Sequence, residues 1–383
     1  MEPVDAEEWD ALISACGGAN AFHSTEWARA LEEAFPQYRM ERWSAMRDGE
    51  RAGLWASFSF APAPFLSFSE ALPWSLPGGL LPLQPLSDAD VEKALNAWEK
   101  AARSRGRCGL TLACSLEESV LKRAGFSLKE RKTTHRLRLP ADAETLWNNY
   151  KGNARTDIRK ARKSGVTTRE ASSEADAAAF YAIYAETMRR FGSPAKPFRL
   201  VRRLALSPIG RLTLAEREGR VAAGLLLLCY AQEASVWMAA GTLESRPFAA
   251  NRLLYDDALR WAVKRGCKRV DFGASPPDQP GVAAFKASFG ASAFEFGVWE
   301  KALSPVRFRL WRTAEPWARR AYRRFSSIRK KASNADKSSL YAEKAPLPDR
   351  HFRVNGAPKP PAFTPGAVPN EAPEWEELRF MAP

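Results

Sequence analysis

The chain has 383 residues and a formal net charge of +14, with 45% hydrophobic and 27% charged residues. This balance is typical of a globular protein that buries a substantial core, and it excludes an intrinsically disordered chain. The longest apolar run, residues 221–231, is about half the length of a membrane-spanning helix, which argues against an integral membrane protein.

The first thirty residues resemble no signal peptide, and they predict a helix with a side-chain N-cap. The opening MEPVDAEEWDALI is acidic and has neither the basic start nor the apolar core of a signal peptide, so we expect a cytoplasmic protein. In AFHSTEW, residues 21–27, Ser24 or Thr25 can accept a hydrogen bond from the backbone of a helix that begins around Trp27.

Two stretches of the chain repeat the same order of elements. Residues 47–54 and 217–225 each predict a hairpin turn followed by an apolar strand. Residues 98–106 and 261–266 each predict the end of a helix that stops at a glycine, and a strand and a further helix follow both. The sequence therefore predicts two copies of one α/β unit.

A basic helix is predicted at the junction of the two copies, within residues 146–166. Its lysines and arginines fall on more than one face, but Arg155 and Arg159 are four residues apart and share one. This pair is our first candidate for binding an anionic substrate group, a phosphate or a carboxylate. A solvated basic helix without a ligand is the alternative.

The second copy gives the most complete pattern. Residues 211–241 predict three strands joined by tight turns, and residues 246–266 then predict a helix. A buried strand at 268–273 and a second helix at 281–291 follow.

This order, ending in the motifs DFG and FKASFG, resembles the second domain of the Fem family, GNAT-fold transferases that move an aminoacyl or acyl group onto an amine. The segments AFHSTEW and PWSLPGG (residues 73–79) and the basic junction resemble that family too, so the resemblance covers about residues 20–302. It implies an α/β fold of two tandem GNAT-like (acyl-CoA N-acyltransferase) domains with mixed central sheets. Residues 1–140 would form the first domain, and residues 141–302 the second, which would carry the active site.

The resemblance also implies a reaction. We expect an N-acyltransferase that acts on an amine of a cell-envelope, peptidoglycan or polysaccharide precursor. No order of Ser, His and Asp or of Cys and His suggests an acyl-enzyme, so direct attack by the amine is expected. The acyl donor, acyl-CoA or aminoacyl-tRNA, would be a co-substrate, and no tightly bound cofactor is expected. The alternatives are a coenzyme A-dependent acetyltransferase of a small soluble amine, or a non-catalytic RNA- or membrane-binding protein that has kept the fold.

Candidate catalytic residues follow from the chemistry of amide formation. Asp271 ends the buried strand and could orient the amine, Lys286 could contact an acceptor carboxylate or the oxyanion, and Tyr255 could protonate the leaving group. Each has an ordinary alternative: Asp271 as a cap of the following turn, Lys286 as a surface lysine, and Tyr255 as a core side chain.

The expected donor loop departs from the coenzyme A pattern of GNAT proteins. Arg246 is present, but Ala249 and Asn251 stand where glycines would let the backbone approach a pyrophosphate. We take Arg246, Asn251 and the helix-opening Trp27 as further candidates for substrate binding. Family members that use peptidoglycan precursors commonly carry a lysine one turn after the opening tryptophan, where this chain has Leu31.

The C-terminal part combines a basic helix with a proline-rich tail. Residues 301–331 contain eleven lysines or arginines and one acid, with Val306 and Leu310 among the apolar residues at helical spacing, so we predict a basic amphipathic helix at 303–333. It could dock by its apolar face on the transferase, lie on anionic lipid at the inner face of the membrane, or hold a polyanion such as tRNA. Residues 334–383 predict an extended or disordered tail.

The five cysteines show no pairing or grouping with histidine that is typical of a metal site. We expect Cys229 and Cys267 to lie in strands as small buried side chains, without zinc or disulfides.

Overall fold

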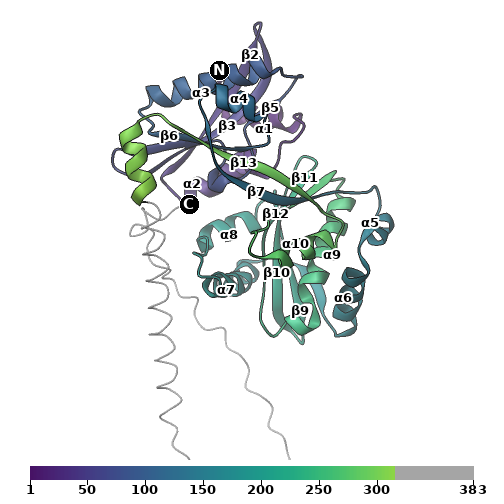
Figure 1. Ribbon diagram of the computed structural model, residues 1–383. Helices are drawn as coiled ribbons and strands as arrows, with labels where there is room; N and C mark the ends of the chain where they lie inside the picture. Colours follow the sequence, from purple (N-terminus) through teal and green to yellow (C-terminus); the bar gives the residue numbers. More distant parts are fainter. Residues whose placement is uncertain (315–383) are drawn as a thin grey trace, which may run out of the picture.

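The computed structural model describes residues 1–314, which form a mixed α/β fold around one sheet of 13 strands (Figure 1). The N-terminal half, residues 1–140, contains β1 (Glu2–Pro3), α1 (Ala6–Ser14), η1 (Ala21–His23), α2 (Thr25–Ala34), β2 (Tyr38–Arg47), β3 (Glu50–Ala63), β4 (Leu66–Glu70), η2 (Pro73–Ser75), β5 (Leu80–Pro82), α3 (Asp88–Ser104), β6 (Gly109–Cys114), α4 (Glu118–Arg123) and β7 (Ser127–Arg138).

The C-terminal half, residues 141–302, contains α5 (Ala143–Asn149), α6 (Gly152–Lys163), β8 (Thr167–Glu170), α7 (Glu174–Arg190), α8 (Phe198–Ala205), β9 (Gly210–Arg217), β10 (Arg220–Tyr230), β11 (Glu233–Gly241), η3 (Arg246–Phe248), α9 (Ala250–Lys264), β12 (Arg269–Ala274), α10 (Pro280–Ala287) and β13 (Ser292–Ala302). Residues 305–314 are helical.

Local sequence accounts for the helix ends. Ser24 is the N-cap of α2, and its hydroxyl accepts a hydrogen bond from the backbone N–H of Trp27 at 3.1 Å. Helices α3 and α9 are followed by Gly106 and Gly266, both in the left-handed region, where a residue without Cβ carries no steric penalty. The predicted N-cap and glycine ends are confirmed.

The predicted repeat also appears in the two halves. The hairpins β2–β3 and β9–β10 turn at Asp48–Gly49 and at Glu218–Gly219, where both central residues have positive φ. Such turns match the right-handed twist of the strands that they join. After each hairpin comes a third strand, a helix, and a parallel partner strand: β4 pairs with β6, and β11 pairs with β12.

The two halves exchange their last strands. The sheet order is β1-β2-β3-β4-β6-β13-β7-β12-β11-β10-β9-β8, with β5 beside β3. Strand β13, from the C-terminal half, pairs with β6, while β7, from the N-terminal half, pairs with β12. Figure 1 shows β7 and β13 running together between the upper and the lower lobe. The exchange joins the two halves through backbone hydrogen bonds.

A shared hydrophobic core also holds the halves together. Trp27 and Phe58 of the N-terminal half belong to the same buried cluster as Phe180, Leu204 and Leu226 of the C-terminal half. Two further cores lie mainly in one half each, around Trp55 and Trp98 in the first and around α9 in the second, and the exchanged strands contribute to both. Burial of apolar side chains at this junction fixes how the two halves are placed against each other.

The basic helix is described up to residue 314, and one side of it packs against the N-terminal half. Phe308 and Trp311 pack against the core, near Phe68, whereas Val306 and Leu310 are exposed. The apolar residues at helical spacing therefore do not all dock, because Phe308 and Trp311 make the contact with the core. The rest of the predicted helix and the predicted tail lie outside the described residues.

The cysteines are buried, as predicted for small side chains. All five cysteines are buried free thiols; Cys229 lies on β10, but Cys267 precedes β12 instead of lying in the strand. Within residues 1–314, every helix is too short or too polar to span a bilayer.

Candidate functional site

A cavity of about 500 Å³ lies between the two halves. The N-terminal half contributes η1, residues 74–82 and the end of β6 to its wall. The C-terminal half contributes β11 and β12, and the exchanged strands β7 and β13 complete it. Residues 74–79, within the PWSLPGG segment, therefore reach the central cavity.

Strands β11 and β12 part where they meet this cavity. They pair in parallel over Glu233–Ser235 and Arg269–Asp271, and no further pairing of the two strands is found among the described residues. Trp237 is an extra residue in the pairing of β11 with β10, a β-bulge that redirects the strand. On the other side, Gly273 adopts a positive φ of 76°, and the register of β12 against β7 shifts there. The two strands thus open a wedge onto the cavity.

The corresponding place in the N-terminal half is closed by the chain itself. Strands β4 and β6 pair over three residues in the same way, but the backbone N–H of Ala71 then donates to the carbonyl of Thr111 at 2.9 Å. The N–H of Gly78 donates to the carbonyl of Ala113 at 3.0 Å. A Cβ on Gly78 would lie 2.3 Å from Leu72, so glycine is required for this loop to fill the gap. The wedge is therefore open in the C-terminal half alone.

Asp271 lies at the point where the strands part, and its carboxylate is held by three donors. Oδ1 accepts hydrogen bonds from the hydroxyl of Thr134 and from the backbone N–H of Gly273, and Oδ2 accepts one from Nε of Arg136 at 3.0 Å. Its side chain lines the cavity. The carboxylate is fixed in direction and has lone pairs left toward the cavity, which suits a group that orients an amine.

Lys286 lies behind the same wall and is only 4% exposed. Its Nζ donates to the carbonyl oxygens of Gly273 and Ala274, both at 2.7 Å. Burial lowers the pKa of Lys286 to about 8, against an opposing effect of the Asp271 charge. The pKa of nearby His135 is lowered, first by burial and then by the Lys286 charge. Lys286 therefore holds the 273–274 turn in place instead of lining the cavity.

His23 faces the cavity from the N-terminal half. Its Nδ1 lies 3.0 Å from the Asn20 side-chain oxygen, whereas Nε2 is buried without a hydrogen-bond partner among the described residues. Burial is the largest cause that lowers its pKa to about 4, so the imidazole is neutral at pH 7. A buried ring nitrogen without a hydrogen-bond partner is costly to the fold.

The low pKa of His23 predicts an acid-sensitive fold. Because the folded pKa lies below the unfolded value of 6.5, the stability from the neutral ring is complete above pH 6.5 and is lost as the pH falls toward 4. Relative to His23→Gln, the wild type should lose about 2 kcal/mol of unfolding free energy between pH 7 and pH 5. Urea unfolding of both proteins at pH 7 and pH 5 measures this loss. An equal change in unfolding free energy in the two proteins would contradict the prediction.

The cavity favours an anionic ligand. Four cationic side chains line it, namely Lys132, Arg136, Lys196 and Arg269, against two acidic ones, Glu233 and Asp271. Arg136 stacks on Phe294 at 3.8 Å, and Nζ of Lys196 lies 3.3 Å above the ring of Trp74. A cleft with an excess of positive charge concentrates anions.

The candidates for donor binding lie at the far end of β11. Arg246 is exposed in η3, and Asn251 is in the first turn of α9 with its Oδ1 buried and unpartnered among the described residues. Arg190 reaches the same end, where Nη2 donates to the carbonyl of Gly241 at 3.3 Å. Its Nε and Nη1 have no partner among the described residues. Two arginines, Arg190 and Arg246, and the Asn251 side chain thus lie where β11 leads into α9.

Two other candidates are packed inside the protein. Tyr255 lies between Phe272, Phe285 and Phe289, and burial raises its pKa. Trp27 is fully buried and meets Trp74 and Trp237 edge-on. Neither lines the cavity, and Trp27 supports two residues that do.

The basic pair Arg155 and Arg159 lies on α6, outside the cavity lining. Arg155 donates to the backbone carbonyl of Asn148 at 3.1 Å, and Arg159 stacks over Trp147 at 5.4 Å. Both side chains therefore turn toward α5.

Sequence reasoning missed the contribution of β7. Lys132, Thr134 and Arg136 line the cavity and come from the strand that crosses into the C-terminal half. They are spaced two residues apart, so a period-two pattern could have placed them on one face. Nothing local in the sequence indicated which half that face would meet.

Comparison with protein families finds a match to the acetyltransferase (GNAT) domain over residues 148–287. No curated protein matches the sequence. The match includes β11 and β12, which form the wedge, and α9, which follows β11. It indicates an acyltransferase.

Several solved structures share this fold over most of the chain. FemX is similar with a TM-score of 0.65 and 17% identity, covering 81% of this chain and 99% of FemX. The C-terminal domain of a putative lysylphosphatidylglycerol synthetase from Agrobacterium fabrum has a TM-score of 0.53 and 12% identity, covering 80% and 94%. A tandem GNAT protein from the clavulanic acid biosynthesis pathway has a TM-score of 0.50 and 15% identity, covering 79% and 97%. The predicted fold of two tandem GNAT-like units is confirmed.

Proposed function

We propose that this chain, an acyltransferase of the tandem GNAT fold, transfers an acyl or aminoacyl group to an amine bound in the cavity between its halves. The observation that carries the proposal is the wedge between β11 and β12, which opens onto that cavity. Its counterpart in the N-terminal half is filled by residues 71–78. We therefore expect a single reaction centre, which would lie at Asp271 where the wedge meets the cavity.

The donor would enter the wedge with its phosphates toward the N-terminus of α9. Helix N-termini present unpaired N–H groups to anions, and Arg190 and Arg246 add positive charge at that end. The donor carbonyl would then lie along the parted edge of β11, where a backbone N–H of the strand can stabilise the oxyanion. Asn251 would contact the donor through its unpartnered side-chain oxygen.

The amine would be held by Asp271, with Lys286 keeping the 273–274 turn in place. Attack of the neutral amine on the donor carbonyl forms a carbon–nitrogen bond and a tetrahedral oxyanion. Collapse of this intermediate breaks the bond to the thiol or ribose hydroxyl, which leaves with the proton that the amine gives up. No acyl-enzyme is needed, and Asp271 would orient the amine through the lone pairs not used by Thr134, Arg136 and Gly273.

The acceptor would be an amine on an anionic cell-envelope precursor. The excess of cationic side chains in the cavity supports an acceptor that carries phosphate or carboxylate. The similarity to FemX and to a lysylphosphatidylglycerol synthetase, whose name describes an aminoacyl lipid, agrees with an envelope role. The chain would work in the cytoplasm, with membrane or tRNA contact through residues 303–331 as part of the proposal.

Thermal stability in the presence of donors tests this proposal. A ligand that binds the folded state raises the melting temperature by mass action. We expect acetyl-coenzyme A, or aminoacyl-tRNA but not uncharged tRNA, to raise it, and His23→Gln to leave that shift unchanged because His23 faces the acceptor side. If neither donor raises the melting temperature at concentrations well above those of cellular donors, the proposed donor site is wrong.

A further inference from the structure

A hydrophobic side chain protrudes at the tip of the β3–β4 hairpin. Phe65 is 90% exposed, and its backbone has a positive φ of 63°. A bulky residue is rare in that conformation, and exposure of the ring to water adds a further cost. The position is thus unfavourable in the free protein on two counts, which points to a partner that covers the ring.

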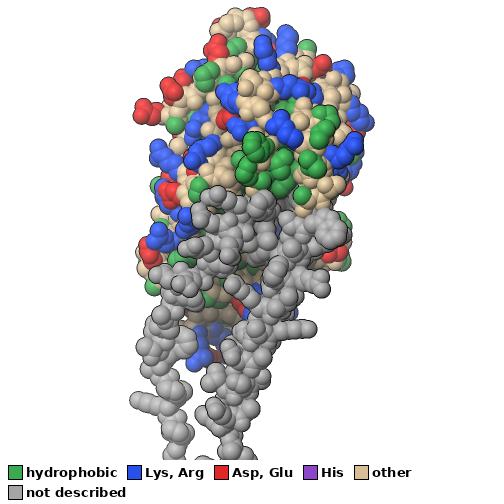
Figure 2. Space-filling view, turned by 90° about the vertical axis from the view of Figure 1, so that its left-hand side faces the viewer, with side chains coloured by type: hydrophobic (Ala, Val, Ile, Leu, Met, Phe, Trp, Pro, Cys, Tyr) green, Lys and Arg blue, Asp and Glu red, His purple; other side chains and the backbone are tan. Residues whose placement is uncertain are grey.

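The C-terminal helix adds two more exposed hydrophobic side chains beside this tip. The described residues expose seven large hydrophobic side chains, and three of them are Phe65, Val306 and Leu310. Nη1 of Arg307 donates to the carbonyl of Phe65 at 3.3 Å, which joins the helix to the tip. Since Phe308 faces the core, Val306 and Leu310, one turn apart, face outward. We call Phe65, Val306 and Leu310 the apolar tip; Figure 2 shows hydrophobic side chains gathered on the face that carries this helix.

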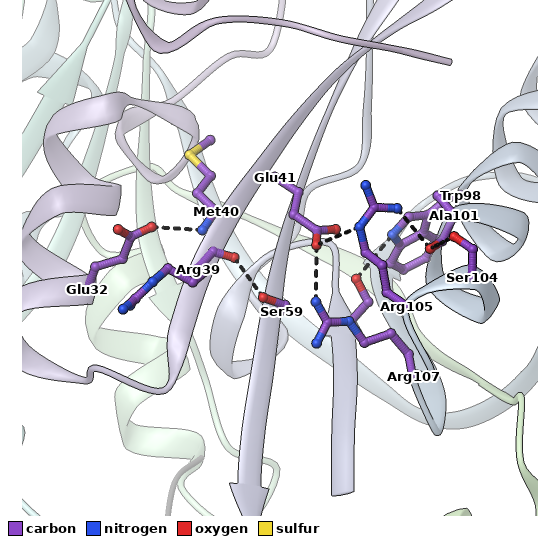
Figure 3. A network of polar contacts seen from close by, with 11 residues as sticks. Glu32, Arg39, Met40, Glu41, Ser59, Trp98, Ala101, Ser104, Arg105 and Arg107 are labelled. Carbon is purple, nitrogen blue, oxygen red and sulfur yellow. Dashed lines mark hydrogen bonds and ion pairs between the residues drawn. The ribbon is translucent and has the colours of Figure 1, made fainter. Parts of the chain in front are cut away.

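Positive charge surrounds the apolar tip. Arg307 and Arg309 form no ion pair with an acid among the described residues, and the nearby carboxylates are each shared by two cations. Glu41 lies between Arg105 and Arg107, as Figure 3 shows, and Glu99 lies between Arg103 and Lys301. Arg307 also donates to the carbonyl of Gly106, so the Glu41 cluster adjoins the tip. The surface therefore has an excess of cations around an apolar centre.

We propose that the apolar tip and its surrounding arginines dock this protein on an anionic lipid surface. Aliphatic and aromatic side chains that project from a cationic surface enter the headgroup region of a bilayer, while the cations meet anionic headgroups. An RNA would use the cations but gains little from Val306 and Leu310, so the side chains favour lipid. None of these residues lines the cavity, and docking does not depend on the proposed transfer reaction.

Vesicle co-sedimentation of the full chain tests the docking surface. The probes are phosphatidylcholine vesicles with and without phosphatidylglycerol, at low and at high salt. We expect binding to the anionic vesicles alone, and at least tenfold weaker binding for Phe65→Asn and for Leu310→Ser. Asparagine tolerates the left-handed backbone at position 65, and Leu310 is exposed, so both variants should fold. Phe191→Ser, which removes a side chain that is 60% exposed elsewhere, is the matched control and should bind like the wild type.

Four results would overturn the proposal. The first is absence of binding to anionic vesicles. The second is binding that Phe65→Asn and Leu310→Ser leave unchanged, since charge elsewhere in the chain would then suffice. The third is equal loss in Phe191→Ser, which would indicate a general effect of surface hydrophobicity. Binding to a polyuridylate RNA with the same dependence on Phe65 would also contradict a lipid-specific role.

Discussion

Asp271→Asn is expected to lower the rate of acyl transfer about 100-fold or more, with the fold intact. The substitution keeps the size of the side chain but removes the negative charge that pairs with Arg136 and that we propose holds the amine. Loss of a group that positions or deprotonates a reactant costs two to four powers of ten in rate. The rate should be measured with saturating donor, so that a loss in turnover is separated from a loss in binding.

Asp278→Asn is the matched control, because Asp278 is an exposed acid in the loop that follows the same strand. It should transfer at the wild-type rate. If Asp271→Asn also retains that rate, Asp271 serves only as a cap for the Gly273 turn, and the reaction centre lies elsewhere.

In the wild type, the free energy of unfolding should rise by about 3 kcal/mol between pH 7 and pH 10.5 because of Lys286, and Lys286→Met should lack this rise. The pKa of the buried ammonium is about 8 in the folded protein, against 10.5 when unfolded, so the unfolded state binds more protons between these values. Unfolding free energy then rises with pH through this window in the wild type, and the variant lacks the rise. Denaturant unfolding of both proteins from pH 7 to pH 10.5 measures the difference.

Lys264→Met gives the reference for this comparison, since Lys264 is exposed at the end of α9. It should follow the wild type at every pH. A Lys286→Met curve parallel to the wild type would mean that Lys286 titrates as in water and is not held against the Gly273 and Ala274 carbonyls.

Local elements could be predicted from the sequence because short-range chemistry determines them. The turn at Glu218–Gly219, the Ser24 cap and the glycine ends of α3 and α9 depend on residues a few positions apart. The strand exchange could not be predicted in this way. Whether β7 pairs with its own half or with β12 depends on packing between distant segments, and both arrangements fit the same pattern of residues.

Only part of the cavity lining carries a local signal in the sequence. Asp271 and the loop at 73–79 lie in motifs with a recognisable order, and the structure brings both to the cavity. Arg136 and Thr134 come to Asp271 only through the exchanged strand, so no local signal linked them. The docked face of the basic helix could not be predicted, because helical spacing alone does not tell Val306 and Leu310 from Phe308 and Trp311.

The most direct test of the proposed reaction is transfer of label to an amine. Wild type and Asp271→Asn would be incubated with radiolabelled acetyl-coenzyme A or aminoacyl-tRNA and an extract of amine-bearing envelope precursors. We expect label in a product that resists hydroxylamine, as an amide does and an ester or thioester does not, and far less of it with Asp271→Asn. If the folded wild type labels no amine from either donor, or if Asp271→Asn labels it equally well, acyl transfer at this cavity is contradicted.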